Sequence, residues 1–126
     1  MTYAYWTVLI AGLMPYVATI ISKWRCSYDN AQPRVGLDQL PPMNRRANWA
    51  QLNAFEAFPL FASAIIIAHI VKVDQLMINQ LAVLFITFRA LYIWAYIADW
   101  PKLRSAFWLG ALICVVYIFI MIARVG

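Results

Sequence analysis

Charged side chains are scarce in this sequence. Of its 126 residues only 12% are Asp, Glu, Lys or Arg, which is about half the share found in soluble domains. Hydrophobic residues make up 65% of the chain, whereas an ordinary soluble chain is roughly half apolar. Because so few charges cannot cover the surface of a soluble protein of this size, the composition excludes that class. It indicates that lipid surrounds much of the chain.

Cysteine and histidine are also rare, with two and one residues respectively. Cys26 lies just past the first apolar run and Cys114 lies in the middle of the fourth, so we expect two unpaired thiols. No cysteine and histidine stand at metal-ligand spacing, and we expect no metal site. His69, near the far end of the second apolar run, is interpreted as an interfacial or packing residue with no catalytic role.

Four apolar runs come close to the ~20 residues that a spanning helix needs. They cover residues 3–21, 54–71, 76–98 and 105–123. They do not alternate as half-buried strands do, and an open sheet edge is not tolerated in lipid. The first run lacks a basic leader and a small-residue cleavage site, so we expect it to be retained as a span. The sequence therefore predicts an all-α membrane protein, a single domain over residues 1–126 that forms a bundle of four transmembrane helices.

The basic residues are distributed unevenly between the expected loops. The second loop has one basic residue, Lys72, and the tail has one, Arg124. The first and third loops together carry Lys23, Arg25, Arg34, Arg45, Arg46, Lys102 and Arg104. The positive-inside rule then places loops one and three in the cytoplasm. We expect a multi-pass protein, of a bacterial inner membrane, with both termini on the other side. Because this topology explains the net charge of +5, no nucleic-acid partner is expected.

Prolines indicate where the expected helices bend and where they end. Pro15 and Pro59 lie within spans and should bend them. The first loop extends to about Pro42, and the second helix is expected from near Asn44 to Val71. The third helix should end near Asp99, where Pro101 closes it, and the fourth should begin at about Leu103.

Two polar stripes run through the second and third expected helices. Residues three, four and seven apart share a helix face, and that spacing joins Arg46, Asn53 and Glu56, and likewise Arg89, Tyr92, Tyr96 and Asp99. Arg89 should lie roughly 15 Å from the Asp99 end, so both stripes fall in the cytoplasmic half of the membrane. Ionisable residues within spans are costly and mark function by default.

Two interpretations of these stripes remain open. Glu56 and Arg89 could form a buried salt bridge that only fixes helix packing. Alternatively, both could belong to a site for a polar ligand that carries carboxylates and amines. The second interpretation accounts for hydrogen-bonding capacity beyond one ion pair, in Gln51, Asn53, Tyr92, Tyr96 and Arg104.

Three motifs resemble those of the MAPEG family, the membrane-associated proteins in eicosanoid and glutathione metabolism. One is residues 46–61, RANWAQLNAFEAFPLF, which contains the run Asn-x-x-Glu-x-x-Pro. Another is residues 88–96, FRALYIWAY, and the third is the Arg104–Ser105 pair that opens the last helix. With the four spans and the long first loop, the resemblance covers nearly the whole chain, and it suggests a bacterial-type member.

The resemblance implies a four-helix bundle that forms a homotrimer, with glutathione, the co-substrate, bound between subunits. It implies that Asn53 and Glu56 hold the tripeptide backbone and that Arg104 is the catalytic residue, stabilising the thiolate. The other glutathione contacts that it implies are Arg46, Gln51, Arg89, Tyr92 and Tyr96, and a base from Lys23 or Arg25 is expected to reach a carboxylate.

The function implied is a membrane-embedded, glutathione-dependent transferase or peroxidase that acts on lipophilic electrophiles or lipid hydroperoxides. Membrane lipids and a lipophilic substrate are the expected partners besides the other copies in the homotrimer. Trp49 stands where some relatives carry arginine, and Ala57 where some carry tyrosine, which weakens the case for an eicosanoid synthase.

Two alternatives remain. A non-catalytic membrane protein that binds a thiol or a lipid would use the same residues. A small four-helix transporter would have a similar length, but exporters of that kind carry their glutamate in the first helix. Here the first span has no charge, and Arg89 is a poor companion for a cation exporter.

Overall fold

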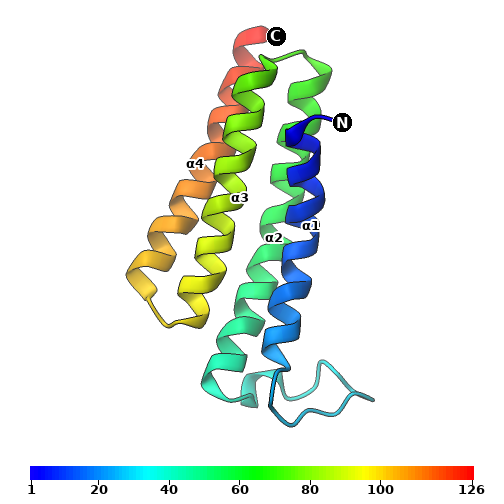
Figure 1. The fold of residues 1–126 in the computed structure, drawn as a ribbon, viewed down its shortest axis with the longest axis vertical. Coiled ribbons are helices and arrows are strands. Elements are labelled where there is room, and N and C mark those ends of the chain that lie inside the picture. Colours follow the sequence, from blue (N-terminus) through cyan, green and yellow to red (C-terminus); the bar gives the residue numbers. More distant parts are fainter.

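The computed structural model describes all 126 residues as four long helices that run alternately up and down (Figure 1). The helices are α1 (Tyr3–Ser22), α2 (Pro42–Ile70), α3 (Gln75–Ile97) and α4 (Pro101–Val125), and a short 3-10 turn, η1 (Leu37–Gln39), lies in the first loop. There is no strand, and each of the four helices is long and apolar enough to cross a membrane. The predicted fold class, an all-α four-helix membrane bundle, is confirmed.

The two ends of the bundle differ in what they carry. Figure 1 shows the long loop between α1 and α2 and the turn between α3 and α4 at one end, which we call the loop end. Both chain termini and the α2–α3 turn lie at the opposite end, the terminal end. This arrangement agrees with the prediction that loops one and three share a side.

Proline sets two helix starts earlier than the sequence analysis expected. Pro42 opens α2 and Pro101 opens α4, because the missing N–H of proline is no loss in the first turn of a helix. The third helix ends at Ile97 instead of near Asp99, which is in a left-handed turn with φ 62°. Asp99 therefore does not continue the α3 stripe that begins at Arg89.

Both internal prolines lie in helices that continue through them. The hydroxyl of Thr19 donates to the carbonyl oxygen of Pro15 at 2.9 Å, and that of Ser63 to the carbonyl oxygen of Pro59 at 2.7 Å. Such back-bonding one turn along a helix commonly accompanies a bend. It also occupies carbonyl groups close to the hydrogen bond that each proline removes.

Small residues bring the helices together. The buried face of α1 consists of Ala4, Thr7, Ala11, Pro15, Ala18 and Ser22. Small side chains allow close backbone approach, which drives helix association where water does not. At the first loop, the side-chain amide of Asn44 donates to the carbonyl oxygens of Ile21 and Trp24, at 3.1 and 2.8 Å. These bonds fix the end of α1 against the start of α2.

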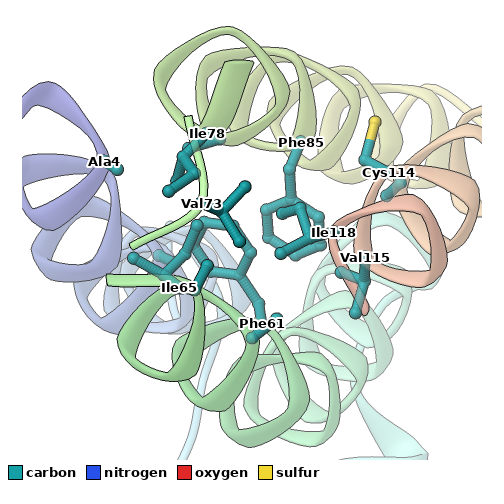
Figure 2. Close-up of a cluster of buried hydrophobic side chains, with 14 residues drawn as sticks. Ala4, Phe61, Ile65, Val73, Ile78, Phe85, Cys114, Val115 and Ile118 are labelled. Atoms are coloured by element: carbon teal, nitrogen blue, oxygen red, sulfur yellow. The ribbon is translucent and has the colours of Figure 1, made fainter. Parts of the chain in front are cut away.

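The main core lies toward the terminal end and draws side chains from all four helices (Figure 2). At its edge nearer the loop end, the rings of Phe61 and Phe85 stack with centroids 3.9 Å apart. Between α3 and α4, the ring of Phe88 lies so close to Gly110 that an added Cβ there would come within 2.9 Å of it. Helix α4 is thus positioned by a ring packed on a glycine.

The lone histidine packs within the bundle, and the two cysteines are unpaired. His69 bonds through Nδ1 to the carbonyl oxygen of Ile65 at 2.7 Å and through Nε2 to the hydroxyl of Thr2 at 3.0 Å. Its ring stacks on Tyr5 with centroids 4.1 Å apart. The prediction of a packing histidine is confirmed, and Cys26 and Cys114 are both free, as expected.

Candidate functional site

Most of the predicted site residues meet in a cleft between α2, α3 and α4. Nearer the loop end, a cavity of about 260 Å³ is lined by Asn53, Tyr92, Tyr96, Arg104, Ser105 and Trp108. We call this the polar chamber. Arg104 reaches it from the first turn of α4, and the two tyrosines reach it from the last two turns of α3.

A second cavity of about 250 Å³ continues the cleft toward the middle of the bundle. Its polar lining is Asn53, Glu56 and Arg89, and its seven hydrophobic lining residues are Ala57, Leu60, Phe85, Trp108, Ala111, Leu112 and Val115. We call this the apolar chamber. Asn53 and Trp108 line both chambers, so the two cavities adjoin.

Arg89 and Glu56 line the same cavity but do not form the salt bridge that was one interpretation of the sequence. The Arg89 side chain is only 3% exposed, and its Nη2 donates to the side-chain oxygen of Asn53 at 2.7 Å. Because a guanidinium has five N–H donors, this one bond leaves further donors for a ligand. Glu56 is exposed on the surface of the chain. A guanidinium and a carboxylate thus stand in one cleft without neutralising each other.

Two tyrosine rings of α3 lie between two guanidinium groups, and we call the row Arg89, Tyr92, Tyr96 and Arg104 the ladder. The guanidinium carbon of Arg89 lies 4.4 Å from the ring centroid of Tyr92. The rings of Tyr92 and Tyr96 meet edge to face at 5.7 Å. The guanidinium carbon of Arg104 lies 4.6 Å from the Tyr96 ring. Contacts of this kind attract a cation to a ring face, so the ladder fixes two guanidinium groups on one wall of the cleft.

Two predicted residues lie elsewhere. The guanidinium of Arg46 binds the end of α3, where Nε and Nη2 donate to the carbonyl oxygen of Ile97 at 3.3 and 3.0 Å. Gln51 lies on the other side of α2, in a cavity of about 530 Å³ that it shares with Lys23 and Arg34. The structure thus brings Asn53, Glu56, Arg89, Tyr92, Tyr96 and Arg104 together, and leaves Arg46 and Gln51 apart from them.

Sequence reasoning missed Trp108, which belongs to both chambers. It follows Arg104 by four residues and therefore shares its helix face, which is the signal that could have found it. Arg34 was also missed as a site residue, because a position in a long irregular loop has no periodicity to read. It lines the cavity beside Lys23 and Gln51.

The chemistry available in this cleft is that of binding and polarising an anion. Two guanidinium groups and two phenols face the cavities, with one carboxylate beside them. Arginine stays charged even where water is scarce, so it holds an anion in such a setting. The apolar lining next to these groups would allow a lipophilic molecule to enter the same cleft.

One of the comparisons with known proteins identifies a family. No curated protein and no solved structure matches the chain. A model of the MAPEG family matches residues 3–124, which is nearly the whole chain. That family consists of membrane bundles and includes glutathione transferases and peroxidases. Four spanning helices, the polar cleft and this match together establish that the chain belongs to the MAPEG family.

Proposed function

We propose that this protein is a glutathione-dependent transferase or peroxidase that acts on lipophilic electrophiles or lipid hydroperoxides. The observation that carries the proposal is the ladder from Arg89 to Arg104. It lies in the same cleft as Glu56, and neither arginine forms an ion pair with that carboxylate. Glutathione has two carboxylates, one ammonium and one thiol, so it needs cations, an anion and a polarising group in one cleft. These are the groups that the cleft offers.

Each part of glutathione has a suitable partner. Glu56, the one carboxylate of the cleft, suits the ammonium. Arg89 suits a carboxylate, because Asn53 takes only one of its donors and also holds it in place. The hydroxyl groups of Tyr92 and Tyr96 make no hydrogen bond within the subunit, and Tyr96 lies beside Arg104 in the polar chamber. The tripeptide backbone then lies along Asn53, between the two chambers.

Arg104 is placed to stabilise the thiolate. A thiol of pKa about 8.5 is mostly protonated at neutral pH, and a nearby cation or helix N-terminus lowers that value. Arg104 supplies the cation from the first turn of α4, where the helix dipole also favours an anion. The thiolate sulfur would attack an electrophilic carbon and displace its leaving group. In the peroxidase reaction, two thiols reduce a hydroperoxide to an alcohol and water and become a disulfide.

A homotrimer accounts for the residues that one subunit leaves unused. Glu56 is exposed within α2, and an ionisable group facing lipid is costly. Gln51, Lys23 and Arg34 line a cavity on the opposite side of the same helix. If that face of one subunit packs against the cleft of the next, Glu56 is covered and Gln51 and Lys23 reach the second carboxylate. In this proposal the loop end faces the cytoplasm, where glutathione is available.

The test is turnover by the full chain purified in detergent. We expect glutathione to conjugate 1-chloro-2,4-dinitrobenzene with release of chloride, or to reduce cumene hydroperoxide, and chemical cross-linking to give a trimer. Glutathione binding without either reaction would favour the non-catalytic binding protein. An absence of glutathione binding would reject the proposal.

A further inference from the structure

Trp49 of α2 lies at the loop end of the cleft, beside the polar chamber but outside it. It precedes Asn53 by four residues and Glu56 by seven, so it shares the helix face that borders the cleft. The centroid of its ring lies 6.4 Å from that of Tyr96, with the two planes tilted by 47°, within the range over which aromatic rings attract each other. Trp49 lines neither chamber. Within the chain, its link to the site is the Tyr96 ring.

Arg104 depends on the same ring for its position. Its side chain makes no hydrogen bond and no ion pair within the chain, and its guanidinium carbon lies 4.6 Å from the centroid of the Tyr96 ring. An arginine has many rotamers, so ordering it costs free energy unless a contact holds it. Tyr96 is only half-buried, and its ring is bounded by Tyr92 on α3 and by Trp49 on α2. The position of Arg104 is thus linked to α2 through two rings.

A second guanidinium holds Trp49 itself. Arg45 precedes Trp49 by four residues on the same face of α2, and its guanidinium carbon lies 5.4 Å from the centroid of the Trp49 ring. The hydrogen bonding of Arg45 is incomplete: Nη1 donates to the carbonyl oxygen of Asp38 at 3.3 Å, but Nε is buried without a partner. A buried donor without a partner costs free energy. The ring contact offsets that cost, because tryptophan is the best of the aromatic rings for binding a cation.

We infer that Trp49 is a positioning residue for the proposed reaction: it braces the Tyr96 ring and thereby holds the guanidinium of Arg104 beside the thiolate of glutathione. This inference rests on the proposed function. The brace affects the rate because the stabilisation that a cation gives to an anion depends on their separation, and a displacement of about 1 Å can cost on the order of a hundredfold in rate. Without Trp49, glutathione would still bind, but less of it would be ionised near neutral pH.

The test is Trp49→Ala in the full-length protein in detergent, with glutathione and S-methylglutathione as the two ligands. S-methylglutathione has no ionisable thiol, so its Kd, measured by calorimetry, reports on binding alone, and we expect it to stay unchanged. We expect the pKa of the thiol of bound glutathione, measured from the ultraviolet absorbance of the thiolate as the pH varies, to rise by about half a unit to one unit. The kcat for 1-chloro-2,4-dinitrobenzene should fall about three- to tenfold at neutral pH and recover as the pH rises. An unchanged thiol pKa would overturn the inference and leave the proposed function intact.

Two further variants separate bracing from a general effect on the fold. Trp49→Phe keeps a ring next to Tyr96 and should retain most of the kcat, so equal losses in Trp49→Phe and Trp49→Ala would overturn the bracing role. The matched control is Trp24→Ala. Trp24 is also an exposed tryptophan at the loop end with an arginine on its ring, Arg25 at 5.7 Å, but it lines neither chamber. Its removal should leave the thiol pKa and kcat unchanged.

A double-mutant cycle tests whether Trp49 acts through Arg104. In the Arg104→Ala background, Trp49→Ala should cause no further rise in the thiol pKa, because two residues that act through one group are not additive. A shift of the same size in that background, or in Trp24→Ala, would overturn the inference. Failure of the unmodified protein to bind either ligand would overturn the proposed function, and this inference with it.

Discussion

The guanidinium of Arg46 donates two hydrogen bonds to the backbone carbonyl oxygen of Ile97, from Nε at 3.3 Å and from Nη2 at 3.0 Å. The carbonyl groups in the last turn of a helix have no partner within the helix, so Arg46 of α2 caps α3. The ring of Tyr96, which precedes Ile97, is in contact with the guanidinium of Arg104. Arg46 thereby fixes the end of the ladder without lining either chamber.

Arg46→Ala should therefore act on stability before it acts on ligand binding. Hydrogen bonds from a charged group contribute about 1.5–3 kcal/mol to stability. We expect the free energy of unfolding to fall by that order, measured by thermal unfolding in detergent. Arg45→Ala is the control, because Arg45 makes only one hydrogen bond, exposed, from Nη1 to the carbonyl oxygen of Asp38 at 3.3 Å, beside its contact with the Trp49 ring. Equal unfolding temperatures for the two variants would contradict the capping role.

The Phe88–Gly110 contact gives a second prediction. A Cβ at position 110 would lie 2.9 Å from the Phe88 ring, whereas a Cβ at Gly12 would meet Phe58 at an ordinary 3.4 Å. We expect Gly110→Ala to lower the free energy of unfolding by about 1–3 kcal/mol, the usual range for overpacking, and Gly12→Ala to change it much less. A thermal-shift comparison tests this. Two equally stable variants would mean that α3 and α4 separate freely.

The terminal end gives a prediction that should leave the site untouched. A carbonyl oxygen only accepts, so the 2.7 Å contact with Ile65 puts the proton of His69 on Nδ1, and Nε2 accepts from the Thr2 hydroxyl. We expect His69→Ala to destabilise the protein by roughly 1–3 kcal/mol and to leave glutathione affinity unchanged. Thr2→Val, which removes one of the two bonds, should have a smaller effect. A large change in glutathione affinity would show coupling between the two ends.

The sequence predicted the spans well because each has a length and an apolar content that only a bilayer explains. It also predicted the Asn53–Glu56 and Arg89–Tyr96 faces, because residues three, four and seven apart lie together on any helix. Gln51 was grouped with Asn53 for its hydrogen-bonding capacity and by motif, not by helix face. Residues two apart do not share a face, and Gln51 accordingly lines the cavity on the other side of α2.

The partner of Arg46 could not be predicted for a different reason. The stripe from Arg46 to Glu56 is continuous along α2, but the distance to the end of α3 depends on how the two helices pack. The left-handed turn at Asp99 ends α3 at Ile97, and this brings a carbonyl oxygen without a helical partner opposite Arg46. Neither fact is encoded in the periodicity of α2.

Glu56→Gln tests the proposed contact with the ammonium of glutathione. We expect the variant to weaken glutathione binding at least tenfold in calorimetry, because a neutral amide loses the charge-assisted interaction. The control is Asp38→Asn, which removes a carboxylate from the exposed first loop and should leave Kd unchanged. Equal losses in the two variants would indicate that net charge, and not this contact, governs binding.

Arg104→Ala separates catalysis from binding. Arg104 lies on the Tyr96 ring at the first turn of α4 and lines the polar chamber. If Arg104 stabilises the thiolate, its removal should raise the pKa of the thiol of bound glutathione by one unit or more, and one unit corresponds to about 1.4 kcal/mol. We expect a loss of kcat of at least tenfold near neutral pH, recovered in part as the pH rises, and a weaker ultraviolet absorbance of the bound thiolate. Glutathione affinity and the trimer should change little.

The alternative role for Arg104 is to anchor α4 to lipid head groups at the loop end. Lys102 is the matched control because it is exposed on the same first turn and lines neither chamber. If anchoring is the role, Arg104→Ala and Lys102→Ala should both weaken the protein's stability in the membrane and leave kcat intact. Arg104→Lys divides the two roles further, since a lysine still anchors but lacks the planar fork that stacks on Tyr96. A fully active Arg104→Ala protein would end the thiolate assignment and shift the search to Tyr96, whose ring now carries that guanidinium.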